Sequence, residues 1–213
     1  LCARAALRCG AGLVSVGVPE EIYTVTAVKN DEAMPFPLPS AEGKLARDAL
    51  PVLLERLQKS DVCVLGPGLG RSDALTALVQ AVVTQSGTPL VLDADALFAV
   101  AQDVTVLDRA CAPIVLTPHD GEFARLAGPD TAGRAEAASD FAVRHGCTVV
   151  RKGPETVCGL VRNIGREGQT SCVLTLAELE NTPVDMFTTV FVGNSQTRRI
   201  GDKLVTPRGY KNV

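Results

Sequence analysis

The sequence predicts an α/β fold in which helices cover both faces of a parallel sheet. Short apolar segments of strand length recur along the chain, and longer segments with apolar residues at helical spacing lie between them. The strand segments are apolar throughout, which is typical of parallel strands buried on both faces. Polar or glycine-rich residues follow these strands, so we expect a ligand to bind beyond their carboxyl ends.

Composition excludes several classes of partner. The chain has 213 residues, of which 46% are apolar and 21% charged, enough for the core of one large domain or two small ones. The net charge is −3 and no Lys/Arg run occurs, so nucleic acid is not an expected partner. Apolar runs stay below the roughly 18–20 residues of a membrane span, and no membrane partner is expected. A homo-oligomer is left open.

The seven cysteines are scattered and form no Cys-x-x-Cys pair. This usage fits reduced, structural thiols in a cytosolic protein, and no metal site is predicted. No secretory leader is evident, so the expected location is the cytoplasm. The chain starts at Leu1 rather than at Met, which leaves open that it is a fragment.

Apolar spacing, prolines and glycines set the expected elements. Helices are expected over residues 1–9, 45–59, 73–86 and 131–145, with a short one that ends at Gly128. Strands are expected over residues 13–18, 62–65, 89–92, 114–116 and 148–150. Residues 20–30 should form a short helix followed by a strand. Residues 31–40 contain Pro35, Pro37 and Pro39 and should form a surface loop.

The chain's most informative segment joins the strand at 62–65 to a helix capped by Ser72 or Asp73. Gly66, Gly68 and Gly70 occupy alternate positions of the connecting loop. Such glycines allow close approach of a ligand and free backbone N–H groups beside the positive end of a helix dipole. The loop is therefore a candidate anion-binding site, and a tight turn without a ligand is the alternative.

Two further polar clusters follow strands. Asp93 and Asp95 suit a general-base pair or a cation site, although Asp95 is more simply explained as the cap of the next helix. His119 lies near Glu122 after the strand at 114–116, and either a catalytic or a structural role is open for it. Lys152 follows the last strand, where its ammonium group could bind a nucleotide phosphate or be solvated at a turn.

Other charged residues have plainer explanations. His145 is expected at a helix C-terminus, where it suits the dipole. Arg134 and Arg144 are expected to be exposed helix charges.

Residues 3–156 resemble the ADP/ATP-dependent NAD(P)H-hydrate dehydratases, a family with a ribokinase-like fold. The resemblance rests on motifs that occur in the family's order: Ala-Arg-Ala-Ala-Leu-Arg-Cys-Gly-Ala-Gly-Leu-Val (3–14), Gly-Pro-Gly-Leu-Gly-Arg (66–71), Val-Leu-Asp-Ala-Asp-Ala-Leu (91–97), Leu-Thr-Pro-His-Asp-Gly-Glu-Phe-Ala-Arg-Leu (116–126) and Lys-Gly-Pro-Glu-Thr (152–156). It implies a three-layer parallel-sheet domain over residues 1–156. The implied activity is that of a lyase that dehydrates NAD(P)H hydrate, with phosphoryl transfer from ADP or ATP activating the leaving hydroxyl.

The resemblance also implies site residues. The hydrated dinucleotide would be bound by Gly66, Gly68, Gly70, Asp93, His119, Glu122 and Arg125. The nucleotide cosubstrate would be bound by Lys152, Gly153 and Thr156, and a Mg²⁺ ion is expected with its phosphates.

The sequence departs from the family in two places. The family's first strand and nucleotide loop have no counterpart before Leu1, and the Gly-Thr-Gly-Asp segment that supplies the catalytic aspartate does not occur. The aspartates further along the chain, Asp185 and Asp202, do not follow a Gly-x-Gly turn. The catalytic residue is therefore unknown, and turnover by this chain is expected to be impaired.

Residues 157–211 instead resemble the C-terminal end of precorrin-3B C17-methyltransferase, an S-adenosylmethionine enzyme of cobalamin synthesis. The matching segments are Gly-Leu-Val-Arg-Asn-Ile-Gly-Arg-Glu-Gly (159–168), Thr-Leu-Ala-Glu-Leu (175–179), Asp-Met-Phe-Thr-Thr-Val-Phe-Val-Gly-Asn-Ser-Gln-Thr (185–197) and Val-Thr-Pro-Arg-Gly-Tyr (205–210). Residues 157–213 are thus expected to form a small α/β or β-rich segment. Strands at 157–162 and 171–174, a capping box at Thr175 and Glu178, and a hairpin around Gly201 are expected there.

The chain therefore looks composite, either a natural fusion or a misjoined reading of two genes. Three functions follow from this: the hydrate dehydratase, a methyltransferase fragment that would need S-adenosylmethionine, and a nucleotide-binding remnant without catalysis. The dehydratase is preferred because its resemblance covers most of the chain and all the polar clusters at strand ends.

Overall fold

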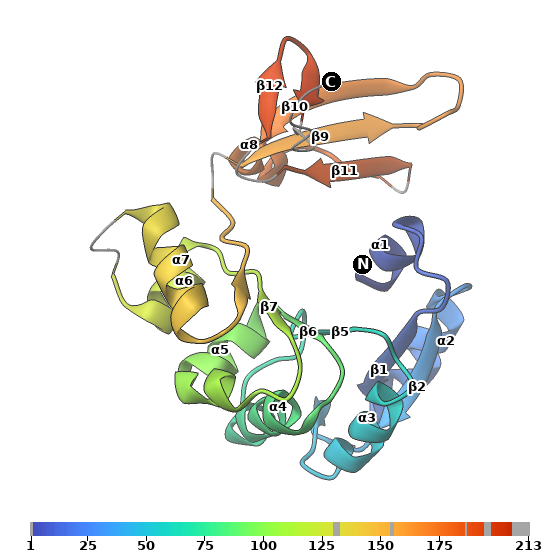
Figure 1. Cartoon of the computed structure of the whole chain (residues 1–213). Helices are drawn as coiled ribbons and strands as arrows, with labels where there is room; N and C mark the ends of the chain where they lie inside the picture. The colour runs from blue at the N-terminus through green and yellow to red at the C-terminus, as the bar shows by residue number, and fades with distance from the viewer. Residues whose placement is uncertain (1, 130–132, 154–155, 186, 194–196, 206–213) are drawn as a thin grey trace. The chain divides into compact units, whose positions relative to one another are not determined.

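The computed structural model describes residues 2–129, 133–153, 156–185, 187–193 and 197–205 (Figure 1). The chain divides into two compact units, Leu1–Arg151 and Lys152–Val213. Among the described residues, no helix is both long and apolar enough to span a membrane.

The first unit alternates strands and helices along most of its length. Its elements are α1 (Cys2–Arg8), β1 (Ser15–Pro19), a 3₁₀ turn (Glu20–Ile22), α2 (Tyr23–Lys29), β2 (Met34–Leu38), β3 (Ser40–Ala41), β4 (Lys44–Leu45), α3 (Ala49–Leu57), β5 (Cys63–Leu65), α4 (Asp73–Gln85), β6 (Leu90–Leu92), α5 (Asp95–Ala101), a 3₁₀ helix (Val104–Arg109), β7 (Ile114–Leu116), α6 (Asp120–Ala127), α7 (Arg134–Arg144) and β8 (Thr148–Val149). Strands β5, β6, β7 and β8 form one parallel sheet in that order, which confirms the predicted class.

One face of this sheet carries the core. The register aligns Leu65, Leu92 and Leu116 in one row across the strands, and all three are buried. Helices α4 and α5 lie along this face (Figure 1). From α4, the core receives the buried side chains Leu75, Leu78, Val79, Val82 and Val83.

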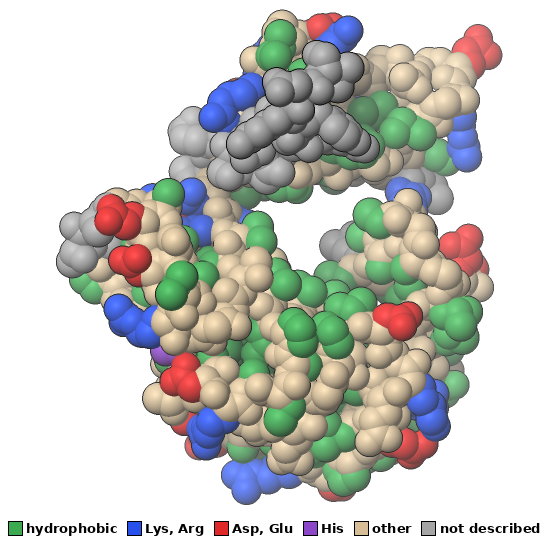
Figure 2. Space-filling model, viewed as in Figure 1, with side chains coloured by type: hydrophobic (Ala, Val, Ile, Leu, Met, Phe, Trp, Pro, Cys, Tyr) green, Lys and Arg blue, Asp and Glu red, His purple; other side chains and the backbone are tan. Residues whose placement is uncertain are grey.

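The opposite face of the sheet, which the sequence also predicted to be covered, is only partly covered among the described residues. Val64 is 55% exposed, and Val91 and Val115, its partners in the same row, are half-buried. Hydrophobic side chains are accordingly visible at the surface of this unit in Figure 2. The local sequence could not show this difference, because both faces of these short strands carry apolar residues.

The proline-containing segment is a strand rather than the predicted loop. β2 pairs in parallel with β1, and Phe36 and Leu38 are buried. Proline is tolerated in a two-stranded sheet because both strands are edges and leave backbone N–H groups unpaired on one side. Residues 20–29 are helical to Lys29, so the strand predicted after that helix is also wrong.

The second unit is rich in β-structure. It contains β9 (Val157–Arg162), β10 (Thr170–Thr175), α8 (Leu176–Glu180), β11 (Thr188–Val192), β12 (Arg198–Ile200) and β13 (Lys203–Val205). Strands β10, β9 and β11 form an antiparallel sheet in that order, and β12 and β13 form the predicted hairpin. The predicted capping box is confirmed, since Glu178 N–H donates to Thr175 Oγ1 at 3.2 Å. Most of the segment 205–210 lies outside the described residues.

Two thiols are protected by the first unit. Burial raises the pKa of Cys63 to about 11, and burial with the nearby charge of Asp108 raises the pKa of Cys147 to about 11. We expect iodoacetamide at about pH 8 to label the exposed Cys9 and Cys172 and to spare these two, as measured by peptide mass spectrometry. A raised thiol pKa stabilises the fold fully below the unfolded value of about 9, and this contribution is lost as the pH rises toward 11. Equal labelling of all four cysteines in the folded protein would contradict the prediction.

Candidate functional site

The glycine loop forms as predicted at the carboxyl end of β5. Gly66, Gly68 and Gly70 have φ values of +123°, +72° and +82°, which side chains other than glycine rarely adopt. Ser72 caps α4, and its Oγ accepts the N–H of Leu75 at 3.2 Å. The loop therefore leads directly into a helix N-terminus.

The turn after β6 lies against this loop. A Cβ atom built on Gly66 would come within 1.8 Å of the backbone oxygen of Asp93 and 2.8 Å of the Ala96 Cβ. Asp93 itself is half-buried and its N–H donates to the backbone oxygen of Leu65 at 3.1 Å. Two of the predicted clusters are thus brought together.

Asp95 does not cap its helix, which corrects the simpler interpretation of that residue. The N-cap of α5 is Ala94, and no side chain caps it. Asp95 Oδ2 accepts the N–H of Gly70 at 2.9 Å, and its Oδ1 accepts Arg71 Nε at 2.8 Å. The carboxylate therefore holds the end of the glycine loop.

Sequence reasoning missed the role of Arg71. Its guanidinium group lies over the ring of Phe98, 4.5 Å from the centroid. Phe98 stands one helical turn after Asp95, so both contacts of Arg71 come from the same face of α5. This spacing was the available signal, but the sequence did not show that α5 meets the loop.

His119 and Glu122 form a capping box at the start of α6. His119 Nδ1 accepts the N–H groups of Gly121 at 3.0 Å and Glu122 at 3.3 Å, and Glu122 Oε2 accepts the N–H of His119 at 2.9 Å. Because Nδ1 is an acceptor, the hydrogen-bond pattern assigns the ring proton to Nε2. Nδ1 is thus already used as an acceptor. Nε2 lies 3.5 Å from Glu122 Oε1, and because the His119 side chain is 58% exposed, a ligand can still reach Nε2.

Asp120 binds two arginines that the sequence did not connect. Its Oδ1 accepts Arg134 Nε at 2.9 Å and Arg151 Nε at 2.8 Å. Arg134 is exposed on α7, as predicted, and is also an ion-pair partner of Asp120. Burial raises the pKa of Asp120, but the hydrogen bonds and charges of both arginines outweigh this and lower it.

The remaining candidates are less constrained. Arg125 is exposed in the last turn of α6. Lys152, Gly153 and Thr156 belong to the second unit, where Gly153 N–H donates to Thr156 Oγ1 at 3.1 Å. Their role in nucleotide binding remains a prediction, as does the role of Arg125. Pro154 and Glu155 of the same motif lie outside the described residues.

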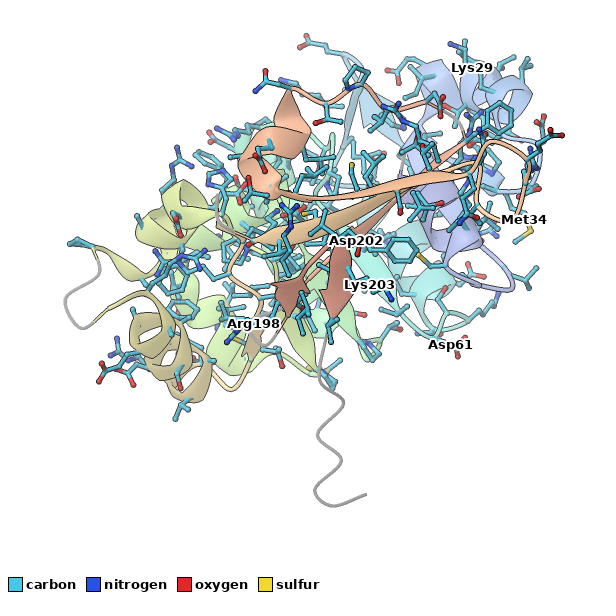
Figure 3. The ribbon with its side chains drawn as sticks, turned by 90° about the horizontal axis from the view of Figure 1, so that it is seen from above. Lys29, Met34, Asp61, Arg198, Asp202 and Lys203 are labelled. Carbon is cyan, nitrogen blue, oxygen red and sulfur yellow. The ribbon has the colours of Figure 1, made fainter. Side chains whose placement is uncertain are left out.

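Neither of the later aspartates resembles a catalytic acid or base. Asp185 Oδ1 accepts Thr188 Oγ1–H at 2.7 Å and Phe187 N–H at 2.9 Å, and these bonds lower its pKa. Asp202 is exposed at the turn of the β12–β13 hairpin, next to Lys203 (Figure 3). Both side chains belong to turns of the second unit.

The metal-binding side chains of the described residues are not grouped as a resident metal ion would require. Over the described ranges of the chain, no group of three His, Cys, Asp or Glu side chains could hold one. A Mg²⁺ ion that accompanies a nucleotide needs no such group, because it often binds through one or two carboxylates and the phosphates of the nucleotide.

His145, at the end of α7, pairs with Asp108 of the 3₁₀ helix Val104–Arg109. The distance from His145 Nδ1 to Asp108 Oδ1 is 2.7 Å, and the His145 ring lies 4.5 Å from that of Phe141. The predicted helix-end position is confirmed, because His145 is the C-cap of α7.

The two functions of His119 can be separated by substitution. His119→Ala is expected to lower the free energy of unfolding by about 1 kcal/mol, because α6 loses its cap. His119→Asn should keep most of this stability, since asparagine caps helices well, but it lacks the Nε2–H donor. Chemical denaturation measures the first effect, and titration with NADPH hydrate measures the second. Equal hydrate affinity in His119→Asn and the wild type would rule out a ligand role.

Comparison with known proteins gives a consistent result. The family described as NAD(P)H-hydrate dehydratase matches residues 1–163. A bifunctional NAD(P)H-hydrate repair enzyme of Moorella thermoacetica is 44% identical over 162 residues, which are 74% of this chain and 31% of that protein. An ADP-dependent (S)-NAD(P)H-hydrate dehydratase of Xanthomonas campestris is 35% identical over 144 residues, which are 67% of this chain and 48% of that protein.

Solved structures agree. The ADP/ATP-dependent NAD(P)H-hydrate dehydratase of Bacillus subtilis, crystallised with ATP and Mg²⁺, matches with a TM-score of 0.53 and 26% identity, over 73% of this chain and 54% of that one. A hypothetical protein of Streptococcus mutans matches with a TM-score of 0.59 and 25% identity over the same shares. The chain spans about a third of the length of the bifunctional relatives and about half of the others. The methyltransferase resemblance of residues 157–211 stays a prediction.

Proposed function

Because the chain belongs to the NAD(P)H-hydrate dehydratase family, we propose that it acts on the hydrated forms of NADH and NADPH. In the proposed lyase reaction, ADP or ATP activates the hydroxyl group of the hydrate, and its elimination regenerates the reduced cofactor. The hydroxyl is a poor leaving group, and phosphoryl transfer to it makes a good one. The substrates are small soluble nucleotides, and we propose the cytoplasm as the location.

The observation that supports this function best is the anchored glycine loop. Its last N–H and Arg71 are held by Asp95, and the loop runs into the capped N-terminus of α4. Backbone N–H groups beside a helix N-terminus suit the pyrophosphate of a dinucleotide. His119 follows β7, two strands along the same sheet, so its Nε2–H can orient the hydrate from the same edge.

The nucleotide cosubstrate is proposed to bind the segment around Lys152. The Lys152 ammonium group would contact a phosphate, and Gly153 and Thr156 would line the adjacent turn. A Mg²⁺ ion, when bound with the phosphates, would neutralise charge that develops during phosphoryl transfer. We propose residues 1–156 as the dehydratase-like domain and residues 157–213 as a separate segment.

A second candidate function is binding without turnover. It is favoured by the sequence, which contains no Gly-Thr-Gly-Asp segment, and by the use of Asp185 in a turn. The two candidates share the same ligands and differ in whether the hydrate is converted.

Recovery of the reduced-nicotinamide absorbance band tests the proposal. Purified protein is mixed with NADPH hydrate, Mg²⁺ and either ADP or ATP, beside a full-length dehydratase of the family as the positive control. Recovery that depends on the nucleotide supports the lyase. Thermal stabilisation by hydrate or ADP without recovery supports binding alone, and neither effect under conditions where the control is active contradicts both candidates.

A further inference from the structure

We propose that Asp95 is a positioning residue for the Gly66–Gly70 loop, which it holds in the conformation that receives the hydrated dinucleotide. The inference rests on the proposed function for its ligand. Asp95 takes no part in the proposed chemistry, and the sequence explained it most simply as a helix cap.

The carboxylate of Asp95 uses both of its oxygens on the loop side. Oδ2 accepts the Gly70 N–H at 2.9 Å, and Oδ1 accepts Arg71 Nε at 2.8 Å. The side chain is 20% exposed, so water competes little for these bonds. Hydrogen bonds to an ionised carboxylate are stronger than neutral ones, and two of them fix both position and orientation.

Asp95 can act as an anchor because its own position is rigid. It is the first residue of α5, and the next two residues, Ala96 and Leu97, are buried in the core. The preceding Ala94 has φ +51° and ψ −116°, a conformation that a residue with a side chain adopts at a cost. This turn brings the backbone of Asp93 against Gly66 and the carboxylate of Asp95 against Gly70.

Arg71 extends the anchor to the rim of the loop. Its guanidinium group is fixed between the Asp95 carboxylate and the ring of Phe98, yet the side chain remains 54% exposed. A bound anion can therefore reach it. Without Asp95, Arg71 would lose its partner and the Gly70 N–H its acceptor.

The loop depends on such an anchor because glycine imposes few conformational restraints. Its glycines have positive φ values and lose much conformational freedom when ordered. If Asp95 orders the loop in the free protein, the ligand does not bear that cost on binding. Loss of the anchor should thus weaken hydrate binding and leave binding of the nucleotide to the segment around Lys152, which Asp95 does not hold, unchanged.

The test compares Asp95→Asn and Asp95→Ala with Asp140→Asn. Asp140 is an exposed aspartate of α7, which packs against β8 at the other end of the sheet, so its substitution removes the same charge outside the site. The readouts are the Kd for NADPH hydrate, the Kd for ADP and hydrogen exchange at the Gly70 amide. Melting curves report folding, and Arg71→Ala provides a variant that leaves the core helix untouched.

We expect Asp95→Ala to weaken hydrate binding about 10- to 100-fold, with faster exchange at Gly70 and unchanged ADP binding. Asp95→Asn keeps an acceptor for the Gly70 N–H, so its affinity for the hydrate should lie between those of Asp95→Ala and the wild type. Arg71→Ala should weaken hydrate binding less than Asp95→Ala does. In the double variant with Asp95→Asn, the fold-change in Kd should be smaller than the product of the two single fold-changes, because the residues act together.

The proposal is overturned if folded Asp95→Ala binds the hydrate as tightly as Asp140→Asn, or if its Gly70 amide exchanges at the wild-type rate. It is likewise overturned if hydrate and ADP binding fall together. Failure of the wild type to bind the hydrate would instead overturn the proposed function, and Gly70 exchange would still decide whether Asp95 orders the loop.

Discussion

Gly66→Ala is expected to lower the free energy of unfolding by about 3 kcal/mol and to abolish binding of the hydrated dinucleotide. The new Cβ would meet the backbone oxygen of Asp93 at 1.8 Å, and a backbone atom cannot move aside as a flexible side chain can. Overpacking typically costs about 1–3 kcal/mol, and a residue with a side chain at φ +123° adds strain of similar size. Relief of the clash requires β5 and the Asp93–Asp95 turn to separate, which would withdraw Asp95 from Gly70.

Gly68→Ala is the matched control for this prediction. It lies in the same loop at φ +72°, but no atom lies within 4 Å of the position that its Cβ would take. Its cost should be about 1 kcal/mol, the ordinary penalty of a left-handed residue. Urea denaturation of both variants, together with hydrate titration, measures the contrast. Similar losses of stability in the two variants would show that close packing between the loop and the turn is not what constrains Gly66.

The parallel sheet and the glycine loop could be predicted because their signals are local. Continuous apolar runs mark β5 to β7, and the glycines and Ser72 mark the loop and the start of α4. The capping boxes at His119 and Thr175 are equally local, although for His119 the sequence left a catalytic and a structural role open. Residues three or four apart in sequence suffice for all these features.

The rest of the site depends on contacts between residues far apart in sequence. Asp95 binds Gly70 across 25 positions, and Arg151 binds Asp120 across 31. A local pattern could offer helix capping for Asp95 but could not show which segment its carboxylate meets. The β2 strand was hidden for another reason, since its alternating prolines suggest a loop while its alternate residues Phe36 and Leu38 enter the core.

Arg151→Ala is expected to lower the free energy of unfolding by about 3 kcal/mol, more than any other substitution in the Asp120 network. The Arg151 side chain is 8% exposed and lies over the fully buried ring of Phe123, 4.3 Å from its centroid. It also joins β8 to α6 through Asp120 and to α7 through the backbone oxygen of Arg134. Breaking a fully buried ion pair costs about 3–5 kcal/mol, and the 46% exposure of Asp120 reduces its share here.

Two further variants divide this effect into packing and charge. Arg151→Met keeps an apolar chain over Phe123 and should cost about 2 kcal/mol, through the lost charge and hydrogen bonds. Arg134→Ala should cost less than about 1 kcal/mol, because both it and Asp120 are largely exposed and such pairs contribute little. Urea denaturation at neutral pH should therefore rank the losses as Arg151→Ala, Arg151→Met and Arg134→Ala.

Acid should remove the charge component of this network. The two arginines lower the pKa of Asp120 below its ordinary value of 3.8, so its stabilisation is complete above that value and is lost as the pH falls through the folded pKa. The stability difference between the wild type and Asp120→Asn should thus be largest near pH 7 and shrink below about pH 4. The loss of stability in Arg151→Met relative to the wild type should shrink over the same pH range, because that loss depends on charge. The additional loss in Arg151→Ala should persist, because it reflects packing. A difference between the wild type and Asp120→Asn that stays constant from neutral to acid pH would mean that the arginines do not stabilise the ionised carboxylate.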